Sequence, residues 1–222
     1  MNLNKEIPIN PKVSRAVIRI FCVLGIIHEM ILALSRLELS VMMPSEIFFL
    51  IGNNYSNNIK AEVIALFFRL FIFFAIIFAS SQNKKFVKLT KSLVYTKVFR
   101  VLLLYLSIYS WIYVVNNYSP DMYDTFRGPH NIIHIAALYG FIAIEAVLSV
   151  ILIIKSTGKV RTIFVLAFIA SLLDTFVFKI MDFLYMFTSA SLEGFIYFIA
   201  SVLYIICFVK TIMLVKNAAD AE

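Results

Sequence analysis

The segment Gly25–Leu32, GIIHEMIL, places an imidazole and a carboxylate side by side in an otherwise apolar stretch, at His28 and Glu29. A charge at the depth of a lipid bilayer costs about 2.5–3.5 kcal/mol on insertion scales, so such groups face protein or water and find a partner of opposite charge. Arg69 and Asp174 also interrupt apolar segments. Because a guanidinium can bind two carboxylates through its planar fork, we expect Arg69 to neutralise both Glu29 and Asp174.

A second pair of opposite charges, Arg100 and Glu145, interrupts two other apolar segments. Heights counted at ~1.5 Å per residue along helices put Glu29 and Asp174 about 20 Å and Arg69 about 16 Å from the inner side. The same count puts Arg100 and Glu145 at about 7–9 Å. The sequence therefore predicts two polar clusters, one in the outer half and one in the inner half. Such clusters either fix helix register or line a path for a proton, an ion or a polar solute.

The three histidines allow rival chemistries. A b-type haem needs two imidazoles on facing helices, and His28 and His134 fall at similar heights, so they are the pair for that site. His28, His130, His134 and Glu29 could form a metal site, although no two-His-plus-carboxylate motif at tight spacing is present. We expect no cofactor, with haem b as the one exception to test.

A lipid-modifying enzyme is a further alternative. Glu29 or His134 would act as the base, and Arg127 or Arg69 would hold a phosphate headgroup. The sequence contains no nucleophile elbow, P-loop or glycine-rich phosphate loop that supports this chemistry. The balance of motifs therefore favours a protein without catalytic activity.

Composition identifies the elements that must hold these charges. Hydrophobic residues make up 62% of the 222 residues and charged residues only 15%, which is more apolar than soluble domains, whose apolar share is near half. The two cysteines, Cys22 and Cys207, fall in apolar segments and are expected to be buried hydrophobes. The composition predicts an integral membrane protein.

The apolar runs predict the architecture. A spanning helix needs roughly 20 apolar residues, and unbroken runs of that length exclude alternating β-strands. The apolar run within residues 37–59 is too short to span a membrane. We expect it to form an outer interfacial segment that begins near Pro44. We predict an all-α, six-helix membrane bundle in one domain over residues 1–222, with spans at about 14–36, 60–81, 94–116, 130–154, 161–187 and 191–215.

Basic residues predict the direction of the spans. Most of the 20 Lys and Arg residues fall on one side of the predicted bundle, and the other side holds only Arg36, Lys60, Arg127 and Lys179. The positive-inside rule then places both termini in the cytoplasm. This orientation explains the net charge of +7, so no nucleic-acid partner is expected. The richness in Lys, Asn, Ile and Phe suggests an AT-rich genome, and we expect a bacterial inner (plasma) membrane protein.

Small residues predict which helix faces pack closely. Gly25 and Ala33 recur with Glu29 at a spacing of four, which puts the carboxylate on the close-packing face of its helix. Ala136, Gly140 and Ala143 recur at spacings of four and three on one face of the fourth span. Both faces are expected to pack closely, and Glu29 is expected to point into the bundle.

These features together favour a transport or conduction function. We expect a membrane protein that conducts or transports an ion or small polar solute, as an oligomer, through Glu29, Arg69, Asp174, Arg100 and Glu145, with His28 nearby. A non-conducting accessory or scaffold subunit of a larger membrane complex has the same features. The third class is the redox or lipid-modifying enzyme described above.

Overall fold

The computed structural model describes residues 11–36, 55–117, 132, 135–184 and 193–217. Within these residues the chain is all-helical, with no strand. The elements are α1 (Pro11–Arg36), α3 (Tyr55–Ala79), α4 (Lys84–Asn117), the π-helix η3 (Ala136–Gly140), α6 (Phe141–Lys155), α7 (Gly158–Leu184) and α8 (Glu193–Asn217). The all-α prediction is confirmed.

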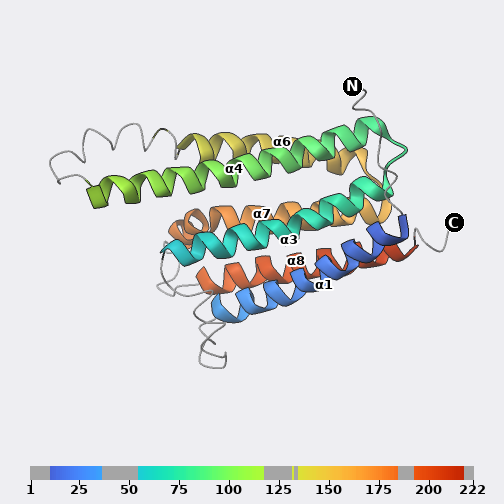
Figure 1. Ribbon diagram of the computed structural model, residues 1–222, viewed down its shortest axis with the longest axis horizontal. Helices are drawn as coiled ribbons and strands as arrows, with labels where there is room; N and C mark the ends of the chain where they lie inside the picture. Colours follow the sequence, from blue (N-terminus) through green and yellow to red (C-terminus); the bar gives the residue numbers. More distant parts are fainter. Residues whose placement is uncertain (1–10, 37–54, 118–131, 133–134, 185–192, 218–222) are drawn as a thin grey trace, which may run out of the picture.

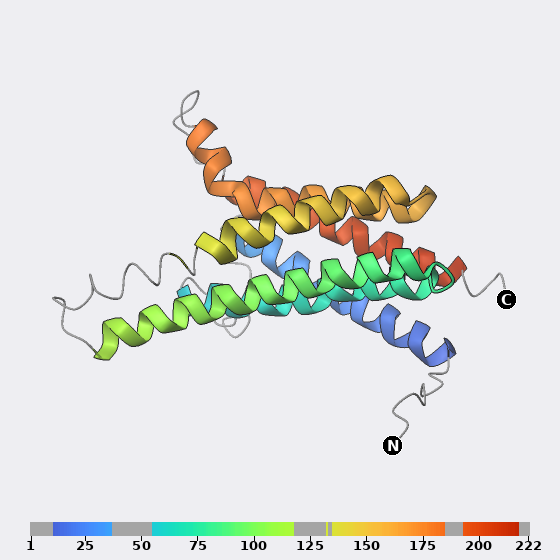
Figure 2. The same cartoon turned by 90° about the horizontal axis from the view of Figure 1, so that it is seen from above.

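The long helices lie side by side along one common direction (Figures 1 and 2). Their packing closes a ring in the order α1, α8, α7, α6, α4, α3 and back to α1, and α3 also contacts α8 across the ring. The first residues of α1, the α3–α4 link, the α6–α7 link and the last residues of α8 all gather at one end (Figure 1). We call this the inner end, because the sequence predicts it to face the cytoplasm.

The helices follow the six predicted windows, with differences at their ends. By length and composition, two of them could cross a membrane on their own, over Val13–Leu34 and Gly194–Lys216. α3 begins at Tyr55, so the last residues of the predicted interfacial segment 37–59 are helical instead, and the rest of that segment lies outside the described residues. The six-span membrane topology stays a prediction.

Two local features differ from the sequence-based expectation. α4 begins at Lys84, about ten residues before the predicted span, because Asn83 caps its first turn: the Phe86 N–H donates to Asn83 Oδ1 at 3.1 Å. Phe86, Thr90 and Leu93 then bury one face of this polar segment at helical spacing. The fourth predicted span is not a regular α-helix, since it widens to the π-helix η3 before α6.

The core is apolar, as in a soluble bundle, but the outer faces of the helices are apolar as well and several charges are buried. Glu29 is 1% exposed, whereas the next residue on α1, Met30, is 51% exposed. Large apolar side chains such as Leu106 of α4 and Ile154 of α6 also point outward, while Glu145 is buried. Helices with apolar outer faces and charged inner positions are typical of proteins whose solvent is lipid.

Of the two small-residue faces, the structure confirms one. Gly25, Glu29 and Ala33 of α1 are all buried, and a Cβ added to Gly25 would lie 2.5–2.9 Å from ring atoms of Phe208 on α8. The other prediction is wrong: Ala136, Gly140 and Ala143 are exposed. Ile142, Glu145, Ser149 and Leu152 of α6 point into the bundle instead, and at 3.6 residues per turn Gly140 and Ala143 then lie on the opposite side of the helix.

Candidate functional site

The first cluster of charges joins α1, α3 and α7 through one guanidinium. Arg69 Nε donates to Glu29 Oε1 at 2.6 Å, and Arg69 Nη1 donates to Asp174 Oδ2 at 2.9 Å. The side chains are 14%, 1% and 19% exposed for Arg69, Glu29 and Asp174, so these are well-shielded ion pairs. The contact predicted from the residue count along each helix is therefore present. With two carboxylates and one guanidinium, this cluster carries a formal charge of −1.

α8 completes the surroundings of Arg69. The guanidinium carbon lies 3.7 Å from the ring centroid of Tyr204, close enough for a cation–π contact. Two polar atoms of the cluster, Glu29 Oε2 and Arg69 Nη2, are buried without a hydrogen-bond partner among the described residues. The cluster therefore retains one acceptor and one donor group for a further polar ligand.

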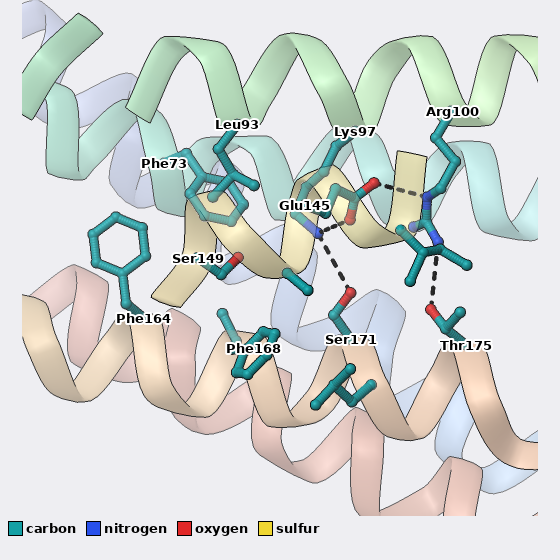
Figure 3. Close-up of a pocket in the computed structure, with 14 residues that line it drawn as sticks. Phe73, Leu93, Lys97, Arg100, Glu145, Ser149, Phe164, Phe168, Ser171 and Thr175 are labelled. Atoms are coloured by element: carbon teal, nitrogen blue, oxygen red, sulfur yellow. Dashed lines mark hydrogen bonds and ion pairs between the residues drawn. The ribbon is translucent and has the colours of Figure 1, made fainter. Parts of the chain in front are cut away.

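The second cluster joins α4 and α6 around Glu145. Its Oε2 accepts a hydrogen bond from Lys97 Nζ at 2.8 Å, and its Oε1 lies 2.8 Å from Arg100 Nε, an ion pair whose angles fall outside those of a hydrogen bond. Figure 3 shows the carboxylate held between the two cations. Two cations and one carboxylate give this cluster a formal charge of +1.

Lys97 was not among the site residues expected from the sequence. It was counted with the basic residues that set orientation on the inner side, but it is only 8% exposed and also lies over the face of Phe73, 6.0 Å from the ring centroid. Its spacing of three from Arg100 is the signal that places both cations on one face of α4. That signal becomes decisive only with the true start of the helix at Lys84.

α7 brings the two clusters together. Lys97 Nζ donates to Ser171 Oγ at 3.4 Å and Arg100 Nη1 donates to Thr175 Oγ1 at 3.3 Å, while Asp174 belongs to the first cluster. Because Asp174 and Thr175 are adjacent in sequence, their heights along the helix differ by only ~1.5 Å. The two clusters thus lie side by side at overlapping heights and form what we call the charged layer: Glu29, Arg69, Lys97, Arg100, Glu145 and Asp174.

The two clusters overlap in height, so the two separate depths expected from the sequence are wrong. Counted at ~1.5 Å per residue from the inner ends of the helices as observed, the six residues lie between about 15 and 27 Å from that end. The earlier start of α4 at Lys84 raises Arg100 to the height of Asp174. Every long helix contributes to the layer, since Tyr204 of α8 contacts Arg69. Its three cations and three carboxylates are formally neutral together.

A small cavity adjoins the layer. It is lined by Lys97, Arg100, Glu145 and the hydroxyl groups of Ser149, Ser171 and Thr175, with apolar walls from α3, α4, α6 and α7 (Figure 3). The volume open to the centre of a water molecule is about 20 Å³. Since a single water needs roughly 10–15 Å³ by this measure, the cavity has room for about one. This cavity is therefore too small for a continuous column of water.

Of the three histidines, only His28 lies in the described part of the chain. The ring of His28 is half-buried and lies 5.5 Å from the ring of Phe68, centroid to centroid. His130 and His134 lie outside the described residues, so the haem pair is not tested. Among the residues that the structure describes, no three His, Cys, Asp or Glu side chains are grouped to hold a metal ion. Cys22 and Cys207 are free and fully buried, as expected.

The local sequence explains why the charges reach the layer. Glu29 and Glu145 lie on inward faces of their helices, with buried residues one turn away on either side: Gly25 and Ala33 around Glu29, and Ile142 and Ser149 around Glu145. Comparisons with known protein families, with curated proteins and with solved structures found no match for this chain.

Proposed function

We propose that this chain is a bacterial inner-membrane protein whose six long helices all cross the bilayer, with both termini cytoplasmic, and that it transports an ion or a small polar solute through the charged layer. The membrane part of the proposal is supported by the apolar outer faces of the helices. The charge distribution supports the orientation, since the inner end is rich in lysine and arginine.

One observation carries the transport part: six charged side chains from five helices, each at most 19% exposed, gather at overlapping heights in the middle of the bundle. Helix register alone can be fixed by one or two polar contacts, whereas six ionised groups at bilayer depth carry a large desolvation cost. Substrate sites of membrane transporters commonly lie near the midplane of the bilayer. Glu29 Oε2 and Arg69 Nη2 offer a proton acceptor and a hydrogen-bond donor there.

The size of the cavity selects among transport mechanisms. A space for about one water does not conduct a hydrated ion, so transport requires helices to separate and open the layer to each side in turn. α7 is the element whose movement has the largest effect, because it contacts both clusters. An oligomer would cover the exposed small residues Ala136, Gly140 and Ala143, over which a second chain can approach closely.

The test is a flux assay with the full chain in liposomes. Proton, potassium and chloride gradients are each followed with a trapped fluorescent indicator, and urea entry is followed by osmotic swelling. Glu29→Gln and Arg69→Ala are expected to lower the flux at least tenfold while the protein still elutes as a folded species. Lys88→Gln is the matched control, since Lys88 is exposed at the inner end and lies outside the layer. Wild-type liposomes without flux of any probe would refute transport.

A second candidate is the non-conducting accessory or scaffold subunit. It is favoured by the ion pairs that each cation of the charged layer forms with a carboxylate. If the layer serves assembly alone, reversing the charges of Arg100 and Glu145 preserves co-purification with a partner. Lys97 must be neutralised in the same variant, because it lies 2.8 Å from Glu145 and would repel an arginine at that position. Flux that survives this reversal would contradict transport through the charged layer. Loss of the partner on reversal would contradict a layer that serves assembly alone.

A further inference from the structure

A groove at the inner end of the bundle is separate from the charged layer. It is formed by Arg15 of α1, by residues 78–83 at the end of α3 and its link to α4, and by residues 155–157 of the α6–α7 link, with Phe86 and Val160 on its walls. Its volume is about 710 Å³, within the range of about 300–1,000 Å³ typical of small-molecule sites. We call it the inner groove.

The chemistry of the lining groups is one-sided. The described residues that line the groove include two cations, Arg15 and Lys155, and the hydroxyl or amide groups of Ser80, Ser81, Gln82, Asn83, Ser156 and Thr157, but no Asp or Glu. Arg15 is 8% exposed and its guanidinium lies 5.7 Å from the ring centroid of Phe78, which holds it at the wall. The lining thus presents many hydrogen-bond donors and a positive potential.

The positive potential extends beyond the lining residues. The described inner-end segments 11–26, 72–100, 150–166 and 205–217 contain no acidic residue. Lys84 and Lys85 begin α4 next to the groove, and the unpaired backbone N–H groups of a first helical turn also favour an anion. An anion that enters the groove therefore meets no carboxylate from the described residues that would repel it.

The walls of the groove are pre-formed. In the α6–α7 link, Ser156 N donates to Leu152 O at 2.9 Å and Arg161 Nε donates to Ile153 O at 3.0 Å. Gly158 continues the chain with φ of +54°, a left-handed conformation that other residues rarely adopt. A ligand is thus bound with little loss of backbone freedom in this link.

We propose that the inner groove binds a phosphate monoester group, with Lys155 and Arg15 as the charged contacts and the hydroxyl and amide groups around Ser81 and Asn83 as donors. An arginine fork matches phosphate oxygens in geometry, and lysine supplies a point charge. Two sources provide this group at the cytoplasmic face: an anionic lipid headgroup of the inner leaflet, and a water-soluble phosphorylated compound. The apolar walls formed by Phe78, Phe86 and Val160 suit the glycerol or acyl portion of the first source.

The experiment titrates the full chain, purified in a neutral maltoside detergent, with three probes by calorimetry. Dihexanoyl phosphatidic acid tests the lipid source, glycerol 3-phosphate tests the soluble source, and dihexanoyl phosphatidylcholine lacks the monoester. We expect at least one monoester to bind and the phosphatidylcholine not to compete. Binding of the lipid alone assigns a headgroup site, and binding of glycerol 3-phosphate assigns a site for the phosphate group itself.

The variants decide whether the inner groove is responsible. Lys155→Gln and Arg15→Gln are each expected to weaken monoester binding about tenfold, the effect of losing one charge-assisted contact. Lys88→Gln removes the same charge from the same end outside the groove and should change the affinity less than twofold. Lys155 is exposed, so its variant folds even if the variant of the buried Arg15 does not. Unchanged affinity in Lys155→Gln, or an equal loss in Lys88→Gln, overturns the proposal.

Discussion

Replacing Glu145 with Gln removes the negative charge that two buried cations share. Lys97 Nζ and Arg100 Nε each lie 2.8 Å from the Glu145 carboxylate, and the three side chains are 11%, 15% and 6% exposed, respectively. Removing one partner of a buried ion pair typically costs about 3–5 kcal/mol, because the remaining charge stays in a poorly solvated site. We expect a loss in this range for Glu145→Gln, since the charge of the second cluster rises from +1 to +2.

A second substitution separates charge imbalance from a simple loss of contacts. Lys97→Gln alone keeps the pair between Arg100 and Glu145, so we expect it to cost only about 1.5–3 kcal/mol, the value of a charge-assisted hydrogen bond. The double variant Glu145→Gln with Lys97→Gln returns the second cluster to a charge of +1. Its loss of stability should therefore be smaller than the sum of the two single losses, by more than the error of about 0.5 kcal/mol expected for independent sites.

The buried cysteines provide the assay. Cys22 and Cys207 are fully buried and free, so a thiol-reactive dye reports their exposure as the protein unfolds on heating in detergent. With about 2–4 °C per kcal/mol for a chain of this size, a loss of 3–5 kcal/mol lowers the midpoint by about 6–20 °C. Chloride is replaced by gluconate in a parallel series, because a chloride ion near the cavity would offset the excess positive charge.

A fall of less than about 2 °C in the thermal midpoint of Glu145→Gln in gluconate would refute the reasoning, since it would mean that water already solvates the charges of the second cluster. Losses that simply add in the double variant would refute it in another way. They would show that Lys97 and Glu145 contribute separately and that the charge balance of the layer has no energetic weight.

Two further pairs of substitutions test the packing of α1 and the capping of α4. Gly25→Ala brings a methyl group against the ring of the fully buried Phe208 and should cost about 1–3 kcal/mol of stability. Gly140→Ala meets no atom within 4 Å and should be neutral or stabilising by up to ~1 kcal/mol. The thermal midpoints of the two variants measure this contrast, and equal midpoints would contradict it. Asn83→Ala removes the cap of α4 and should lower stability by ~1 kcal/mol, while Asn83→Asp keeps an acceptor for the Phe86 N–H and should restore the midpoint; a loss shared by both variants would show that the cap is not the cause.

The sequence predicts the pairing of charges well because pairing follows from a strong constraint. An ionised group at bilayer depth needs a partner, and few candidates exist: Arg69 was the available cation near the height of Glu29 and Asp174, and Arg100 the one near Glu145. The close-packing face of α1 followed from the spacing of Gly25, Glu29 and Ala33. These inferences need only helical periodicity and the cost of burying charge.

Features that depend on where a helix begins were not predictable in the same way. The polar segment after Asn83 has the composition of a loop, so α4 was expected to begin near residue 94, and Lys97 was then counted as an orientation signal at the membrane surface. The π-helix η3 has no composition signal either. Both differences come from tertiary packing, which overrides local propensity at helix ends.

The overlap in height of the two clusters has a consequence that neither cluster has alone. The first carries −1 and the second +1, and they meet on α7, where Asp174 and Thr175 are consecutive. A movement of α7 away from α4 and α6 breaks the contacts of Lys97 and Arg100 with Ser171 and Thr175, while Asp174 withdraws from Arg69 if α3 stays in place. Opening the layer therefore separates opposite net charges in a medium of low dielectric, which is costly unless a solute or water replaces the lost contacts. Under the proposed transport function, the bundle stays closed when empty, and a polar solute that supplies the missing hydrogen bonds lowers the cost of opening.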